Sequence, residues 1–249
     1  MFLVKDFKGF TTYEKVLFAF ILIAQIFILV YFWNNGEAFN TLSVISAISS
    51  ISGVACVIMS AKGRLSTFFY GVIQAATYGY VSYKSFLFGE VGLQVVFGIF
   101  QFIGLYAWLK NMHSDHHTDD PDVQEVDSRG LSIRGWLITI AVTALVYVGT
   151  GYYLDNFTAA KQPFVDALSV GLSLVAQTLM TLRYKEQWIL WIVINMVSIF
   201  LWARLMLQND KLTFEGLSAV TMWVAFLINS VYGYYYWKKL QDVQVTEKY

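Results

Sequence analysis

The chain of 249 residues is 57% hydrophobic and only 14% charged, with a net charge of zero and a mean hydropathy of +0.54. A soluble domain would carry roughly a quarter charged residues, so the composition indicates an integral membrane protein. The balanced charge and the lack of a long basic run exclude a nucleic-acid partner. The single cysteine, Cys56, excludes an intramolecular disulfide and a cysteine-based metal site.

Eight apolar segments are long enough to cross a bilayer, which takes about 20 residues per helix. The sequence predicts helices over residues 15–33, 42–61, 66–83, 90–109, 135–154, 164–182, 187–207 and 214–237. Backbone groups cannot stay unpaired in lipid, and these segments are too long for barrel strands. The predicted fold is therefore an all-α integral membrane bundle with eight transmembrane helices. No small-residue cleavage site follows the first segment, which predicts a retained helix rather than a signal peptide.

Part of the chain recurs 121 residues later. The matching residues are Ser52, Val54, Ala55 and Met59 in the first copy and Ser173, Val175, Ala176 and Met180 in the second. Lys62 and Arg183 follow at the same offset. Duplicated helical bundles are the usual build of secondary transporters, whose binding site lies between the halves.

The repeat divides the chain into four parts. An extra N-terminal helix occupies 1–40, a first triple-helix repeat 41–110, an acidic loop and linker helix 111–160, and a second triple-helix repeat 161–249. Three helices end on the opposite side of the membrane from where they begin, so the linker helix restores the starting side and the repeats run parallel. This three-plus-one-plus-three plan is like that of SWEET sugar transporters.

Lysine and arginine are distributed unevenly between the two predicted sides. Of the 17, 13 fall on the side that holds both termini, and the other four are Lys84, Lys161, Arg204 and Lys211. The positive-inside rule then predicts that both termini lie in the cytoplasm.

The segment between the repeats, residues 111–134, is polar and acidic. His113, His116 and His117 stand there among several aspartates, and imidazole and carboxylate groups are metal ligands. A solvated cytoplasmic linker is the favoured interpretation, because nothing else in the segment has a pattern typical of ordered structure. The sequence therefore predicts no bound metal and no cofactor.

The sharpest local pattern is Trp188-x-x-Trp191-x-x-x-Asn195, whose spacing places all three side chains on one helical face. An interfacial tryptophan belt would explain Trp188. It does not explain Asn195, because an amide near the middle of a span is costly without a partner. Binding is therefore favoured over packing for the three residues.

Other amides lie within the predicted spans. Gln94 and Gln101 are seven residues apart and nearly superposed on one helical face. A polar contact between helices could explain either alone, but together they favour a polar cavity. Asn229 lies at comparable depth, and Gln74 occupies the repeat position of Asn195. Weaker candidates are Gln177 and Asp166, and N-terminal capping explains Asp166 about as well. Gln25, in the extra helix, is interpreted as an ordinary interhelical contact.

Missing motifs narrow the function. No span has a central lysine for retinal, and there is no GxxxxGK[ST] loop, HExxH motif, Ser-His-Asp set or pair of intramembrane carboxylates. The chain is therefore predicted not to be an enzyme. The scarcity of acidic groups in the spans argues against proton or sodium coupling. An amide-rich, aromatic path would bind hydroxyls and carboxamides and hold a delocalised cation over an indole.

With these features in place, the chain resembles the PnuC family of bacterial vitamin transporters over most of residues 41–240. The likeness rests on the Trp188-x-x-Trp191-x-x-x-Asn195 pattern. It extends to Gly89-Glu90-x-x-Leu93-Gln94, Tyr106-x-Trp108-x-Lys110 and Tyr236-Trp237-Lys238.

The resemblance implies that the cargo is nicotinamide riboside, a ribose joined to a cationic pyridinium that carries a carboxamide. It implies facilitated diffusion, with a cytoplasmic kinase phosphorylating and trapping the product. Trp188 and Trp191 would stack on or flank the ring. The residues that would bond ribose or carboxamide are Asn195, Gln94, Gln101 and Asn229.

Two alternatives stay open. The cargo could be another vitamin such as thiamine, which is also a flat cation, or the chain could be a non-transporting membrane receptor or scaffold. The sequence is also compatible with a homo-oligomer, for example a trimer, with the extra helix at a subunit contact and lipid around it. No span contains an internal proline, so gating is predicted to rely on glycines such as Gly53, Gly71, Gly98 and Gly171.

Overall fold

The computed structural model describes residues 5–35, 40–114, 124–157, 163–208 and 211–246. All eight predicted helices are present. They are α2 (Thr12–Asn34), α3 (Thr41–Ala61), α4 (Ser66–Lys84), α5 (Phe88–Leu109), α6 (Ile133–Phe157), α7 (Pro163–Thr181), α8 (Gln187–Gln208) and α9 (Phe214–Thr246). The last helix continues nine residues beyond its predicted end at 237. A short antiparallel hairpin of β1 (Met112–Ser114) and β2 (Gln124–Val126) interrupts the otherwise helical fold.

Six of the helices are long and apolar enough to cross a membrane, namely α2, α3, α5, α6, α8 and α9. Helices α4 and α7 do not reach this level of length and hydropathy over their described residues. The sequence of α4 is rich in tyrosine, serine, threonine and glycine, and the apolar part of α7 runs only from Ala167 to Thr181.

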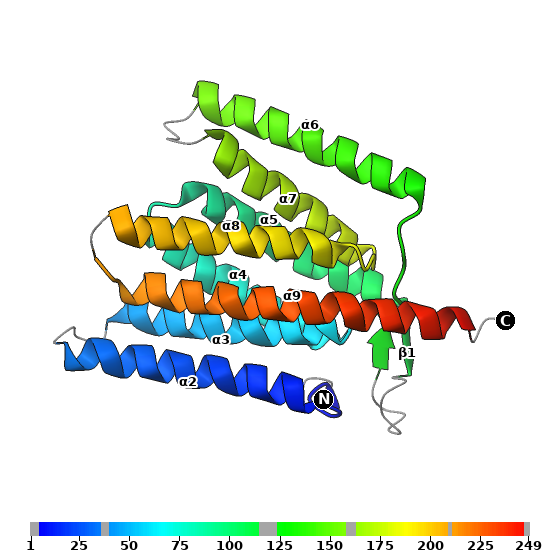
Figure 1. Ribbon diagram of the computed structural model, residues 1–249, viewed down its shortest axis with the longest axis horizontal. Helices are drawn as coiled ribbons and strands as arrows, with labels where there is room; N and C mark the ends of the chain where they lie inside the picture. The colour runs from blue at the N-terminus through cyan, green and yellow to red at the C-terminus, as the bar shows by residue number, and fades with distance from the viewer. Residues whose placement is uncertain (1–4, 36–39, 115–123, 158–162, 209–210, 247–249) are drawn as a thin grey trace.

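Six helices form a closed ring in the order α3, α4, α5, α7, α8, α9 and back to α3, because each packs against the next. Figure 1 shows this ring edge-on, with α8 and α9 in front of α5 and α4. The remaining two lie outside it: α2 packs against α3 and α9, and α6 packs against α7. Opposite pairs in the ring are therefore α3 and α7, α4 and α8, and α5 and α9.

The two ends of the ring differ. Helix α2 begins and α9 ends beside the β1–β2 hairpin, which we call the hairpin end (Figure 1). The α3–α4 and α7–α8 turns lie there too, and the α4–α5 and α8–α9 connections lie at the far end.

Helices α3 and α7 end in the same kind of turn. The Arg64 amide donates to the Met59 carbonyl at 2.9 Å around Gly63, which has a φ of 65°. After α7 the residue with this left-handed backbone is Arg183, with a φ of 68°, and the Tyr184 amide donates to the Leu179 carbonyl at 2.9 Å. The two turns therefore align Arg183 with Gly63 at an offset of 120, one residue less than the offset of 121 that relates Arg183 to Lys62 in the sequence repeat.

Candidate functional site

Four aromatic side chains close the ring interior near the hairpin end. The Trp237 ring of α9 lies 5.8 Å from Trp108 of α5, the opposite helix, and 6.1 Å from Trp188 of α8. Phe68 of α4 packs edge-on to Trp108 at 5.0 Å. All four are buried. We call Phe68, Trp108, Trp188 and Trp237 the hairpin-end cluster.

Hydrogen bonds and glycines fix this cluster. The Trp108 indole donates to the Met180 carbonyl at 3.2 Å, and the Trp237 indole donates to the Ala61 carbonyl at 3.0 Å. A Cβ added at Gly233 would lie 2.7 Å from the Trp188 ring. Trp188 therefore fills space that only a glycine on α9 leaves open.

A second aromatic group closes the ring towards the far end. The Trp202 indole of α8 donates to the Tyr78 hydroxyl of α4 at 2.8 Å, and the Trp223 indole of α9 donates to the same oxygen at 3.3 Å. Phe226 packs edge-on to Trp223 at 5.2 Å. We call Tyr78, Trp202, Trp223 and Phe226 the far-end cluster. Since α4 and α8 are opposite in the ring, the contact between Tyr78 and Trp202 crosses its interior.

Amides occupy the level between the two clusters. On α5, Gln101 is seven residues from Trp108; on α8, Asn195 is seven from Trp188; on α9, Asn229 is eight from Trp237. Two helical turns are about 10 Å along a helix. The three amides therefore lie at one depth on three different helices, and we call Gln101, Asn195 and Asn229 the amide layer. Another seven residues along α8 reach Trp202 of the far-end cluster.

The amino group of each of these amides bonds the protein. The Asn195 amino group donates to the Ser230 hydroxyl at 2.9 Å, that of Asn229 to the Val57 carbonyl at 2.8 Å, and that of Gln101 to the Phe97 carbonyl at 3.1 Å.

The carbonyl oxygens of the three amides have no partner. All are buried and accept no hydrogen bond from any described residue. A buried unpaired acceptor costs about 1–3 kcal/mol, which makes three of them at one depth a candidate site for a ligand.

The other predicted site residues surround the amide layer. Trp191 is half-buried and its ring lies 6.0 Å from Phe97, the residue whose carbonyl holds Gln101. Gln94 lies two turns towards the far end, buried, with its side-chain oxygen also unpaired among the described residues. Trp188 belongs to the hairpin-end cluster, and Trp191 packs against the buried core that contains this cluster.

The structure gives the remaining polar residues of the predicted spans different surroundings. The amino group of Gln177, on α7, is buried and without a partner in the described chain. Gln25 accepts from Ser218 at 2.7 Å and lies on α2, outside the ring. Gln74 is half-buried and would touch a Cβ at Gly53. The side chain of Asp166 lies outside the described residues.

The predicted gating glycines differ in how closely their neighbours pack against them. A Cβ at Gly71 would overlap the Gln101 side chain, and one at Gly53 would lie 2.8 Å from Phe226, so these two allow close packing. Gly98 has nothing within 4 Å of an added Cβ, and Gly171 has only ordinary contacts.

The second strand of the hairpin and the residues that follow it pack against the helical turns rather than lying in solvent. The Val126 amide donates to the Gly63 carbonyl at 3.0 Å, and the Arg129 amide donates to the Arg183 carbonyl at 2.8 Å. The interpretation of a solvated linker is therefore wrong for residues 124–130, because their backbone bonds the α3–α4 and α7–α8 turns. The histidines proposed as metal ligands lie in 115–123 or have undescribed side chains, and the described residues contain no cluster suited to a metal.

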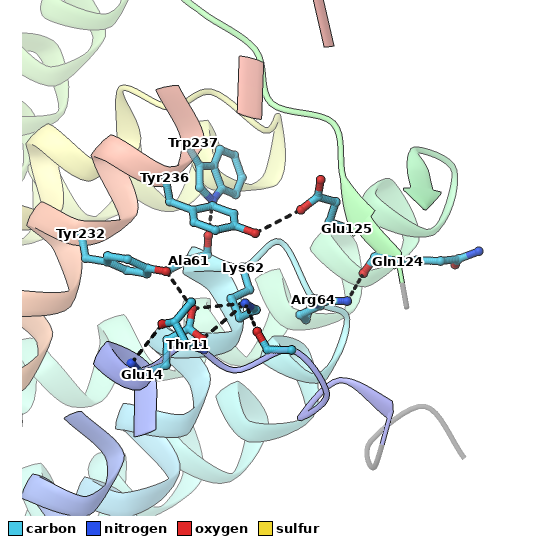
Figure 2. A network of polar contacts seen from close by, with 11 residues as sticks. Thr11, Glu14, Ala61, Lys62, Arg64, Gln124, Glu125, Tyr232, Tyr236 and Trp237 are labelled. Carbon is cyan, nitrogen blue, oxygen red and sulfur yellow. Dashed lines mark hydrogen bonds and ion pairs between the residues drawn. The ribbon is translucent and has the colours of Figure 1, made fainter. Parts of the chain in front are cut away.

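Figure 2 shows the polar network that surrounds the α3–α4 turn. Lys62 and Glu14 form a buried ion pair at 3.3 Å, and the Tyr232 hydroxyl donates to Glu14 at 2.8 Å. Arg64 donates to the Gln124 carbonyl at 3.1 Å. The basic groups of this turn are therefore engaged with the N-terminal segment and the hairpin.

Sequence reasoning missed Ser230, Tyr78 and Trp202. Trp202 could have been found, because it continues the seven-residue spacing of Trp188 and Asn195. Ser230 gives no such signal, since a serine in an apolar helix usually bonds its own backbone.

A closed ring of apolar helices with a buried polar layer between two aromatic clusters places the chain among multi-pass membrane proteins. A family model described as nicotinamide mononucleotide transporter matches residues 43–239. The chain belongs to this family, which is the PnuC family that its motifs resemble.

Similar proteins and a solved structure agree with this family assignment. The chain is 35% identical over 237 residues to the nicotinamide riboside transporter PnuC of Neisseria mucosa, covering 94% of this chain and 84% of that protein. It is 37% identical over 236 residues to the protein of the same name from Haemophilus influenzae, covering 94% and 92%. A crystal structure of the vitamin B3 transporter PnuC superposes with a TM-score of 0.82 at 32% identity and covers 97% of each chain.

Proposed function

We propose that this protein carries nicotinamide riboside across the bacterial inner membrane by facilitated diffusion, and that phosphorylation in the cytoplasm traps the product. The observation that carries this proposal is the amide layer, whose three unpaired carbonyl oxygens lie at one depth, with Trp191 one helical turn from Asn195. Nicotinamide riboside would bring hydroxyl and carboxamide N–H donors to these oxygens and a cationic ring to the indole.

The uncharged layer supports a riboside rather than the mononucleotide that the family description names. A phosphate carries up to two charges and is normally bound by arginine, lysine or a helix N-terminus. Gln101, Asn195 and Asn229 are neutral. Lys62 and Arg64 lie at the hairpin end, where they bond Glu14 and the Gln124 carbonyl.

Within this proposal each candidate residue has a role. Trp191 stacks on the pyridinium ring, and Trp188 closes the hairpin side of the site. The amide layer bonds the ribose and the carboxamide. Gln94, two turns further out, contacts the solute as it enters from the far end.

We propose that the ring consists of two parallel triple-helix repeats, with α6 as the linker helix and all eight helices crossing the membrane. The ring order supports this, since α3–α4–α5 and α7–α8–α9 follow each other head to tail. The packing of Gly104 on Phe68 in the first unit is matched by Gly233 on Trp188 in the second. The hairpin end and both termini would face the cytoplasm.

Facilitated diffusion then requires the two aromatic clusters to open in turn. No ion-coupling acid lies in the amide layer, which supports downhill movement. Lipid, or neighbouring copies in a homo-oligomer such as a trimer, would cover the apolar side chains that α2 and α6 expose.

The test is uptake of labelled nicotinamide riboside into proteoliposomes without ATP or an ion gradient. We expect the internal concentration to reach the external one and not exceed it. Trp191→Ala and Asn195→Ala should lower uptake at least tenfold, as expected for lost stacking or a lost buried hydrogen bond worth about 1.4 kcal/mol. The matched control is Trp33→Ala, because Trp33 is an exposed tryptophan of α2 outside the ring.

Three results would contradict the proposal. Accumulation above the external concentration would exclude facilitated diffusion. Binding without uptake would favour a receptor. Stronger competition by thiamine than by unlabelled nicotinamide riboside would change the cargo.

A further inference from the structure

A chain of hydrogen bonds from α9 sets the polarity of the Asn195 amide, by which we mean its orientation: the amino group is bonded and the carbonyl oxygen is left unpaired. The Ser230 hydroxyl donates to the Phe226 carbonyl at 2.8 Å, and the Asn195 amino group donates to the Ser230 oxygen at 2.9 Å. Ser230 and Asn195 are both almost fully buried. Water therefore does not compete for these bonds.

A serine hydroxyl has one proton and two lone pairs. Because the Ser230 proton is used by the Phe226 carbonyl, its oxygen can only accept from Asn195. The amide must then place its amino group on Ser230, which leaves the carbonyl oxygen without a partner. Reversing the amide would set two acceptors against each other and leave the amino group unpaired.

The amides of Asn229 and Gln101 have the same orientation as that of Asn195, but for a different reason. Their amino groups donate to the backbone carbonyls of Val57 and Phe97, which cannot donate in return. Of the three amides, only Asn195 depends on another side chain for its orientation. Ser230 is therefore the one residue through which substitution can change the polarity of the layer without removing an amide.

We propose that Ser230 is a positioning residue that makes Asn195 a hydrogen-bond acceptor, so that the site selects a solute presenting an N–H or O–H donor there. This inference rests on the proposed function, and it adds the residue that sets the donor requirement. Ser230 itself acts through Asn195 and does not touch the solute.

The experiment measures binding of three ligands to the purified full-length protein. They are nicotinamide riboside, an analogue with a dimethylated carboxamide nitrogen, and an analogue with methylated ribose hydroxyls. We expect Ser230→Ala to weaken nicotinamide riboside about tenfold, as for one buried hydrogen bond. It should have no further effect on the analogue that lacks the donor facing Asn195. Ser230→Thr, which keeps the hydroxyl and so the acceptor for Asn195, should bind within about threefold of the original protein.

The matched control is Ser52→Ala. Ser52 is buried in α3 and donates to the Ile48 carbonyl at 2.7 Å, but it bonds no amide side chain. Ser230→Cys gives a second test if Ser230→Ala does not fold, because a thiol of similar size is a weak acceptor. An intermediate loss is then expected.

Equal weakening of all three ligands by Ser230→Ala would overturn the inference, since it would show a purely structural effect. Unchanged binding in Ser230→Ala or Ser230→Cys would overturn it as well. Failure of the original protein to bind nicotinamide riboside would instead overturn the proposed function, and the inference with it.

Discussion

Arg183 holds a backbone conformation that side chains other than glycine rarely adopt. Its φ of 68° costs roughly 1–2 kcal/mol relative to a relaxed residue, whereas Gly63 occupies the corresponding turn without this penalty. The Arg183 guanidinium lies 3.9 Å from Asp127, and its carbonyl accepts from the Arg129 amide. Partial burial lowers the pKa of this guanidinium, and Asp127 opposes the shift. The strain is retained at the point where the hairpin segment meets α7.

Replacing Arg183 tests this strain. We expect Arg183→Gly to be more stable than Arg183→Ala by about 1 kcal/mol, because both lose the guanidinium and only glycine relaxes the backbone. Thermal unfolding of the two variants in detergent measures the difference. Equal melting temperatures would show that the turn is not strained.

Sequence reasoning identified the amides that line the ring but not how they are held. Gln101 and Asn195 stand out because polar amides are costly in an apolar helix. The different surroundings of Trp188 and Trp191 could not be predicted, since both lie on one face of α8. What separates them is Gly233 of α9, which leaves room for Trp188 alone.

At the scale of helices, Tyr78 joins three elements through one atom. Its hydroxyl accepts from Trp202 of α8 and Trp223 of α9, while its own backbone belongs to α4. This contact links the two proposed repeats across the ring. The spacing of apolar residues along α4 could not reveal it, because it depends on which helices face each other.

We expect Tyr78→Phe to destabilise the protein by about 2–6 kcal/mol, because the change leaves two buried indole donors unpaired at about 1–3 kcal/mol each. The matched control is Tyr80→Phe, which removes the hydroxyl of an exposed tyrosine on the same helix. Chemical denaturation in detergent compares the two. If Tyr78→Phe unfolded at the same denaturant concentration as Tyr80→Phe, the hydrogen bonds of the far-end cluster would contribute little to stability.

The hairpin segment shows where composition misleads. Residues 124–130 read as an acidic linker, yet Glu125 and Val126 are fully buried at the α3–α4 turn. Their attachment comes mainly from backbone amides and carbonyls, which every sequence possesses. Polarity alone therefore could not distinguish this docked segment from a solvated one.

At the scale of the whole molecule, hydropathy and length predicted all eight helices, because apolar runs of this length have few alternatives in a bilayer. The order of the helices around the ring was not predictable, since it depends on contacts between segments far apart in sequence. The proposed repeat relates α3 to α7, α4 to α8 and α5 to α9, and these are the pairs that lie opposite each other in the ring.

The charge distribution makes a topological prediction for the whole chain. In a Cys56→Ser background, Lys211→Cys at the far end should react with an impermeant maleimide on intact cells, and Lys239→Cys at the hairpin end should react only after permeabilisation. Both lysines are exposed, so accessibility reports the side of the membrane. The reverse labelling pattern would place both termini outside the cytoplasm.

The hairpin-end cluster and the far-end cluster lie about 20 Å apart along the helices. Their packing has a consequence for the voltage across the membrane. Packed indoles leave no room for a continuous chain of water molecules, so protons have no continuous hydrogen-bonded route even though the amide layer between the clusters is polar. In the proposed transport cycle each solute therefore waits for helices to shift, on the microsecond to millisecond scale of such motions. The membrane voltage would then persist during the proposed transport, which an open pore would not allow.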